Sequence, residues 1–137
     1  MRSKRQDILR KFNGVSATND PPSIIHLENF LYDERCYLLA ASVNHEVVGF
    51  ILAYRFPSFH ATENVAYLYD LEVLPQNRRS GIGRSLVNEM ISELKADNVK
   101  EIWLGTAIEN VAAQNLFNST GAQKEEETFY EYIYFIP

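Results

Sequence analysis

Apolar residues recur along this chain with two spacings, which separate predicted strands from predicted helices. Alternation over residues 67–75 predicts a central strand, which Pro75 ends because proline has no N–H to donate. The residues expected to share one face of this strand are Tyr67, Tyr69, Leu71 and Val73. Helical spacing follows, with an expected inner face of Ile82, Leu86, Val87, Met90, Ile91 and Leu94. The pattern therefore predicts a strand, a short loop and a helix in direct succession.

The rest of the chain predicts a mixed α/β sheet with helices packed on it. Further strands are expected over residues 36–43, 46–56, 99–106 and 128–136. Further helices are expected over 6–12 and 23–32, and from Glu109 or Asn110 to a left-handed cap at Gly121. A turn at Asn44 and His45 joins the first two strands. Repeats and linkers are absent from the sequence, which predicts one domain over residues 1–137.

The loop between the central strand and its helix is suited to binding a phosphate. The first N–H groups of a helix have no intrahelical partner, and the helix dipole adds positive charge there. Gly81 and Gly83 have no Cβ, so the backbone can approach an anion closely. Formal positive charge comes from Arg78, Arg79 and Arg84. A tight turn with solvated arginines is the alternative interpretation.

The glycine spacing narrows the class of phosphate ligand. A P-loop would need a lysine after its last glycine, and a Rossmann loop would need glycine or alanine where Leu86 stands. The sequence Arg78-x-x-Gly81-x-Gly83 after Leu-Glu-Val-Leu-Pro instead resembles the pyrophosphate loop of the GNAT superfamily of N-acetyltransferases. Members of that superfamily bind acetyl-CoA, so the resemblance implies acetyl-CoA as a co-substrate.

Composition and charge restrict the other possibilities. The net charge of −5 argues against a nucleic-acid partner and is compatible with a cationic small molecule. No apolar run is long enough to span a membrane, and no signal segment is visible, so a cytoplasmic location is expected. Cys36 is the only cysteine and is expected to be a buried, inert thiol rather than a nucleophile. The three histidines have no metal-binding spacing, and no metal is expected.

The resemblance to the GNAT superfamily covers most of the chain. It implies a mixed, mostly antiparallel central sheet with helices on both faces, from which the usual first strand is missing. A second signature, Asn110-x-x-Ala113-x-x-Leu116-Phe117-x-x-x-Gly121, looks like the helix that lines the other wall of the cofactor slot. Asn110 is expected to bind the pantetheine arm, to cap its helix, or both.

The resemblance also implies which residues bind the cofactor. The backbone of residues 71–73 would pair with pantetheine as an added strand, and amides of residues 79–84 would hold the pyrophosphate. The full set expected to bind acetyl-CoA is Leu71, Val73, Arg78, Arg79, Ser80, Gly81, Ile82, Gly83, Arg84, Asn110, Ala113 and Phe117.

Acetyl transfer to an amine needs a base, because amines are mostly protonated at neutral pH. Asp70 is the first candidate base and Glu72 the second, and the two share a face unless a bulge lies between them. Binding the substrate ammonium as a counter-ion is an equal alternative for Asp70. A backbone N–H near Val73 would polarise the thioester carbonyl. The residues expected to bind substrate are Asp70, Tyr69 and Glu109.

Within the superfamily the chain most resembles the aminoglycoside 3-N-acetyltransferases. The resemblance rests on Tyr69-Asp70-Leu71, on Pro57-x-Phe59, and on a tail rich in tyrosine and glutamate. It implies transfer of acetyl directly to a small cationic amine, aminoglycoside- or polyamine-like, and a possible homodimer. One departure is the single acid in the loop 107–109, where those enzymes carry several.

A second departure leaves other functions open. Phe117 stands where many members have a tyrosine that protonates the departing thiolate, and phenylalanine has no proton to give. A CoA-binding sensor that has lost catalysis is therefore one alternative. Acetylation of a protein or peptide amine is the other.

Overall fold

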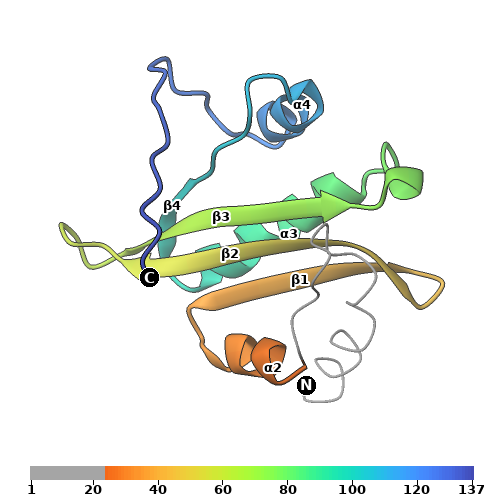
Figure 1. Ribbon diagram of the computed structural model, residues 1–137, viewed down its shortest axis with the longest axis horizontal. Helices are drawn as coiled ribbons and strands as arrows, with labels where there is room; N and C mark the ends of the chain where they lie inside the picture. The colour runs from red at the N-terminus through yellow and green to blue at the C-terminus, as the bar shows by residue number, and fades with distance from the viewer. Residues whose placement is uncertain (1–23) are drawn as a thin grey trace.

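A computed structural model describes residues 24–137 (Figure 1). In chain order its elements are α2 (Ile24–Tyr32), β1 (Cys36–Val43), β2 (Glu46–Pro57), β3 (Asn64–Val73), the short 3-10 helix η2 (Pro75–Asn77), α3 (Ile82–Ala96), β4 (Val99–Trp103) and α4 (Val111–Ser119). The predicted helix over residues 6–12 lies outside the described residues. None of the helices from residue 24 onward is long and apolar enough to cross a membrane.

The four strands form one sheet in the order β1-β2-β3-β4. Strand β2 pairs antiparallel with both β1 and β3, and β3 pairs with β4 in parallel. The predicted mixed, mostly antiparallel sheet is therefore confirmed. Asn44 and His45 form the turn between β1 and β2, as predicted. Both have positive φ, 51° and 68°, which is what a two-residue hairpin turn matching the strand twist requires.

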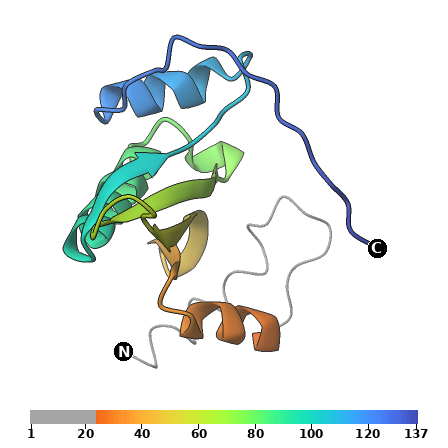
Figure 2. The same ribbon diagram turned by 90° about the vertical axis from the view of Figure 1, so that its left-hand side faces the viewer.

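Helices cover both faces of the sheet, as expected, and each face has its own core (Figure 2). On one face α3 buries Met90 and Leu94 completely against Ile51 of β2. On the other face Leu27 of α2 packs against Val47 and Phe50. The long apolar run of β2 is explained by this arrangement, because its alternate residues enter two different cores.

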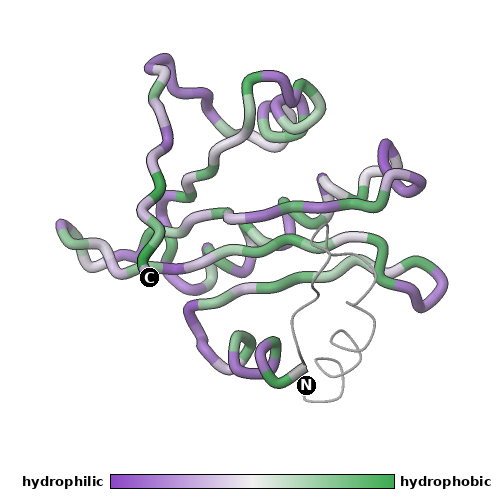
Figure 3. The backbone as a smooth tube through the Cα atoms, viewed as in Figure 1, coloured by the Kyte–Doolittle hydropathy of each residue, from purple (hydrophilic) through white to green (hydrophobic). Residues whose placement is uncertain are grey.

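Three predictions of local structure are wrong. The strand expected over 99–106 ends at Trp103, because the chain then leaves β3 and has no strand to pair with. Ile91, expected on the inner face of α3, is 36% exposed. Residues 128–136, expected to form the last strand, form no regular element. Their alternating pattern remains, and Figure 3 shows an apolar stretch near the end of the chain.

The contrast between Met90 and Ile91 yields a stability test of the α3 packing. We expect Met90→Ala to lower the free energy of unfolding by about 2–5 kcal/mol, because it leaves a cavity in the core under α3. The neighbouring Ile91→Ala should cost under about 1 kcal/mol. Urea denaturation of both variants measures this, and equal losses would contradict the packing described above.

Candidate active site

The parallel pair β3 and β4 separates partway along β3. Residues 64–67 of β3 pair with 99–103 of β4, and β3 then continues to Val73 paired with β2 only. After Trp103 the chain turns away toward α4 (Figure 1). Within the described residues, 68–73 of β3 therefore have no strand partner on this side. Backbone N–H and C=O groups left open in this way can pair with an extended ligand.

The loop after β3 is tied to the strand's end by side-chain hydrogen bonds. Arg78 Nε donates to the carbonyl oxygen of Val73 at 3.0 Å, and Ser80 Oγ donates to that of Asn77 at 2.5 Å. Arg79 has φ 63°, a left-handed conformation that costs a non-glycine residue about 1–2 kcal/mol. Such strain persists only where the surrounding structure imposes it. The loop is thus held in one shape beside the open edge of β3.

The start of α3 has the features of an anion site. Gly81 precedes the helix with φ 84°, where a side chain would be strained, and no atom beyond its chain neighbours lies within 4 Å of a Cβ built there. The first turn carries no acidic residue, so nothing within it offsets the positive end of the helix dipole. The side chains of Arg79 and Arg84 are exposed nearby.

Gly83 has a role that sequence reasoning missed. A Cβ at this position would lie 3.2 Å from Leu116 Cδ2, so the glycine lets α3 and α4 pack closely. Arg84 Nη1 also donates to the carbonyl oxygen of Ser119 at 3.4 Å. No signal in the spacing of Gly81 and Gly83 distinguishes this packing role from close approach of an anion.

The helix α4 begins and ends as the sequence predicts. Asn110 caps it, with Oδ1 accepting from the backbone N–H of Ala113 at 3.1 Å. At the other end Gly121 has φ 100°, and the N–H of Ala122 donates to the carbonyl oxygen of Phe117 at 3.0 Å. Ala113 and Phe117 are half-buried, and Phe117 packs against the α3-side core. Glu109 lies exposed in the turn before α4.

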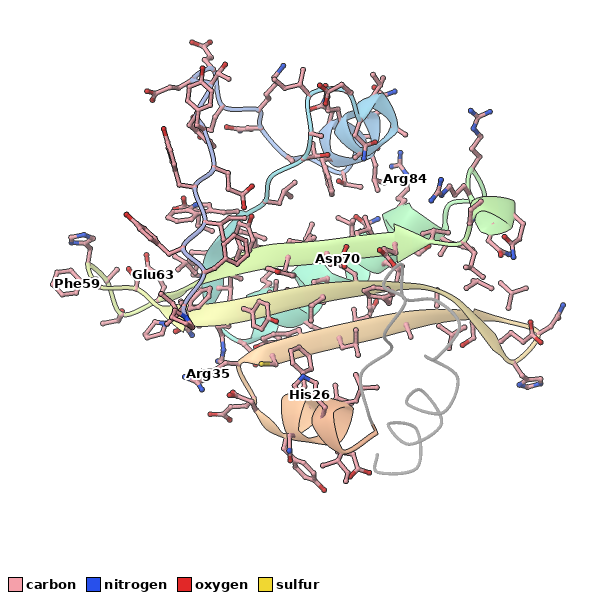
Figure 4. The ribbon with its side chains drawn as sticks, viewed as in Figure 1. His26, Arg35, Phe59, Glu63, Asp70 and Arg84 are labelled. Atoms are coloured by element: carbon pink, nitrogen blue, oxygen red, sulfur yellow. The ribbon has the colours of Figure 1, made fainter. Side chains whose placement is uncertain are left out.

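A β-bulge decides which face of the sheet Asp70 occupies. Leu52 of β2 pairs with Asp70 and Ala53 pairs with Leu68, so Tyr69 is an extra residue in β3. Without it, Asp70 would share the face of Leu68, which is buried under α3. The bulge places the carboxylate on the opposite face, near the carboxyl end of β3 (Figure 4).

The same bulge overturns the predicted strand face. Leu71 and Val73 pack against the core under α3, whereas Tyr69 contacts Tyr54 on the α2 side. The tyrosines and the two aliphatic residues therefore do not share a face. Glu72 follows Asp70 beyond the bulge and is half-buried on the same side as Asp70.

Asp70 lies in surroundings that favour its neutral form. Burial raises the pKa of Asp70 above its ordinary value, and a hydrogen bond from the backbone N–H of Leu71 opposes the rise. The Tyr69 and Tyr54 rings pack edge to face at 5.6 Å, and Tyr67 and Tyr69 lie 6.3 Å apart. Tyr54 was missed in the sequence, although hairpin pairing with Tyr67 brings it here. The Asp70 carboxylate is therefore partly desolvated and follows directly on Tyr69, whose ring contacts those of Tyr54 and Tyr67.

Cys36 pairs with Tyr54 across β1 and β2, but its surroundings do not suit a nucleophile. Cys36 is half-buried at the start of β1 rather than buried, and burial raises the pKa of its thiol, which disfavours the nucleophilic thiolate. Among residues 24–137 no three histidine, cysteine or acidic side chains are grouped so that they could hold a metal ion.

Comparisons with known proteins point to one family. The family model described as Acetyltransferase (GNAT) family matches residues 5–122. The chain is 30% identical over 120 residues to a [Ribosomal protein bS18]-alanine N-acetyltransferase of Escherichia coli (strain K12), covering 80% of each chain. It is 25% identical over 128 residues to aminoglycoside N(6′)-acetyltransferase type 1 of Acinetobacter haemolyticus, covering 91% of this chain and 88% of the relative.

A solved structure has the same fold. It is an aminoglycoside acetyltransferase from an uncultured soil metagenomic sample, in complex with sisomicin. The TM-score is 0.80 at 23% identity, over 97% of this chain and 89% of the other. The expected likeness to aminoglycoside acetyltransferases is confirmed, although the named relative carries the N(6′) designation rather than 3-N.

The raised pKa of Asp70 predicts a pH-dependent stability change. A carboxyl group whose pKa is raised by folding favours the neutral form when folded, so its ionisation opposes folding above that pKa. We therefore expect Asp70→Asn to gain stability relative to the parent as the pH rises from about 4 to 7. Denaturation at several pH values measures the difference.

Asp33→Asn is the matched control with the opposite sign. Hydrogen bonds from Arg35 lower the pKa of Asp33 to about 2, so its ionised form supports folding at neutral pH and that support is lost as the pH falls toward 2. The variant should be less stable than the parent at pH 7. A loss for Asp70→Asn that also grows with pH would show that the Asp70 environment is described wrongly.

Proposed function

The chain belongs to the acetyltransferase (GNAT) family, and from this premise we propose that it acetylates the primary amine of a small cationic molecule. As a member it is an acetyl-CoA-dependent N-acetyltransferase. The proposed acceptor is aminoglycoside- or polyamine-like. The observation that carries this proposal is the bulge at Tyr69, which sets a partly desolvated Asp70 beside tyrosines at the open edge of β3.

Several features of the chain fit the donor, acetyl-CoA. Residues 71–73 of β3 have no strand partner on the β4 side, which suits a pantetheine arm that would pair with β3 as an added strand. No acidic residue in the first turn of α3 offsets the positive end of its helix dipole, and Arg79 and Arg84 lie nearby. This end of the helix therefore suits the pyrophosphate. Asn110 keeps its amide NH₂ for the ligand, because only its Oδ1 serves the helix cap.

Asp70 would supply the proton acceptor for transfer. Asp70 would first take one proton from the ammonium group, directly or through water. As the neutral amine nitrogen then bonds to the acetyl carbon, the carbon–sulfur bond breaks. The nitrogen's next proton is lost through water, while the departing thiolate is protonated. A raised pKa makes the ionised form of Asp70 a stronger base than an ordinary aspartate. Phe117 packs in the core and has no proton for the leaving thiolate, so water or a tyrosine would provide it.

Charge and aromatic side chains support a cationic acceptor. The ionised form of Asp70 attracts an ammonium group, and the faces of Tyr67 and Tyr69, both exposed, can add cation–π attraction of about 0.5–1 kcal/mol. The net charge of −5 would concentrate cations near the protein. One carboxylate can thus first bind the ammonium and then accept its proton.

A peptide N-terminus is the second candidate acceptor. The observation that favours it is the 30% identity to a relative named for acetylating alanine of a ribosomal protein. The two candidates share the donor site and Asp70 and differ only in what binds beside Tyr69. A panel of acceptors therefore separates them, and the sensor alternative predicts no turnover with any.

We expect thiol release from acetyl-CoA with aminoglycosides or polyamines and little with alanine-terminated peptides. Asp70→Asn should lower the rate about 10²–10⁴-fold, because it removes the base, while CoA affinity measured by calorimetry stays the same. Glu72→Gln is the control on the same face and should cost much less. Full activity of Asp70→Asn would eliminate Asp70 as base and as essential counter-ion.

The loop predicts a loss of CoA affinity on substitution. Gly81→Asp places a negative charge at the start of α3 and should weaken CoA binding by roughly tenfold or more, and Arg79→Ala should weaken it less. Gly121→Asp is the matched control, since Gly121 has a similar left-handed conformation with open space around it, at the end of α4. It should lose stability but retain CoA affinity. Equal CoA affinity in parent and Gly81→Asp would rule out this loop as the pyrophosphate site.

A further inference from the structure

The proposed acetyl transfer leaves a thiolate on CoA, which needs a proton. Asp70 accepts a proton in this reaction, and Phe117, which packs against the core on the α3 side, has none to give. A side-chain donor would have to lie near the place where β3 and β4 separate, because the pantetheine arm is proposed to run along the open edge of β3. One tyrosine hydroxyl lies there.

Tyr67 stands at the point where β3 and β4 separate. It is the last residue of β3 that pairs with β4, opposite Trp103, and β4 ends at that pair. The Tyr67 hydroxyl oxygen lies 3.9 Å from a Cβ built at Gly105, in the segment that leads away to α4. The ring therefore reaches from β3 toward the departing segment, and its hydroxyl lies at the closed end of the separation.

The Tyr67 side chain is suited to act as a proton donor. It is 38% exposed, and within residues 24–137 its hydroxyl takes part in no hydrogen bond. Its ring contacts that of Tyr69, with centroids 6.3 Å apart, and this contact helps to hold it in place. A phenol gives up its proton more readily than the aliphatic hydroxyl of serine or threonine, so it is the better general acid.

The length of the pantetheine arm brings its sulfur close to this hydroxyl. The main chain of the arm matches about four extended residues, or about 14 Å. Along β3 the distance from Val73 to Tyr67 is about 17 Å, since the bulge at Tyr69 shortens the strand by one step. An arm that enters beside Val73 would therefore place its sulfur next to residues 68–70. That position is within one side-chain length of the Tyr67 hydroxyl.

The other tyrosines are less well placed. Tyr37 donates its hydroxyl proton to Asp97 at 2.5 Å, on the α3 side of the sheet. Tyr69 leans toward β2, where its ring packs edge to face on Tyr54 at 5.6 Å. Three further tyrosines, each at least 85% exposed, lie in the last stretch of the chain, which Figure 2 shows away from the sheet: Tyr130, Tyr132 and Tyr134.

We propose that Tyr67 is the general acid that protonates the departing thiolate, an assignment that rests on the proposed function above. As the carbon–sulfur bond breaks, the sulfur keeps the bonding electrons and takes the phenol proton, which leaves CoA as a thiol and Tyr67 as a phenolate. The proton that the amine nitrogen loses through water replaces the one that Tyr67 gave. Release of the other amine proton from Asp70 to solvent then restores the enzyme.

Kinetics separate loss of the acid from loss of binding. Tyr67→Phe keeps the ring and removes only the hydroxyl, so the contact with Tyr69 should persist. We expect kcat to fall about 10²-fold with little change in KM for acetyl-CoA. This is the lower end of the range for general acid catalysis, because a thiolate is a tolerable leaving group. Tyr54→Phe removes a hydroxyl from the neighbouring strand and should lower kcat much less. A kcat of Tyr67→Phe close to that of the parent would overturn the proposal.

Desulfo-CoA, which lacks the sulfur atom, tests the contact without turnover. By calorimetry, exchange of CoA for desulfo-CoA should cost the parent roughly two- to tenfold more affinity than it costs Tyr67→Phe. Tyr54→Phe and Tyr69→Phe should behave as the parent does. An equal cost in parent and Tyr67→Phe, or a reduced cost in Tyr69→Phe instead, would overturn the assignment. A parent that acetylates no amine would contradict the proposed function, and this comparison would still decide whether the Tyr67 hydroxyl meets the sulfur.

Discussion

The separation of β4 from β3 is the constraint on which the candidate site depends. Both strands pair through Tyr67 and Trp103, and from there β3 is supported only by β2. A strand without a strand partner on one side must satisfy its backbone groups there with side chains, water or a ligand. Because α3 and α4 pack together through Gly83 and Leu116, the loop before α3 is kept beside this opening. Donor binding and packing of the two helices are therefore linked.

The bulge at Tyr69 solves a conflict between packing and chemistry. The core under α3 takes Ala66 and Leu68 from the first half of β3, and Leu71 and Val73 from the second. A regular strand could not supply both pairs, because alternation would turn Asp70 into that core, where an ionised carboxylate is costly. One extra residue resolves this and leaves Asp70 half-buried on the opposite face.

Local signals predicted much of this fold and of the loop. The helical spacing of apolar residues predicted the bounds of α3, and Asn110 and Gly121 predicted the two ends of α4. These predictions succeeded because helix caps and helical periodicity depend only on residues close together in the sequence. A bulge between Asp70 and Glu72 was allowed for, but its actual position at Tyr69 escaped prediction, because tyrosine suits either face of a strand. Residues 128–136 were wrongly predicted as a strand because alternation predicts an extended chain but identifies no pairing partner. Contacts between distant residues, such as Gly83 with Leu116, leave no local pattern.

The central claim is that the open edge of β3 receives the pantetheine arm of acetyl-CoA. Hydrogen exchange of the free and CoA-bound protein tests it most directly, residue by residue. The account predicts that those amides of residues 71–73 that β2 leaves unbonded slow markedly on binding, while amides of β1 do not change. Unchanged exchange across 71–73 with CoA fully bound would contradict the account and place the donor elsewhere on the molecule.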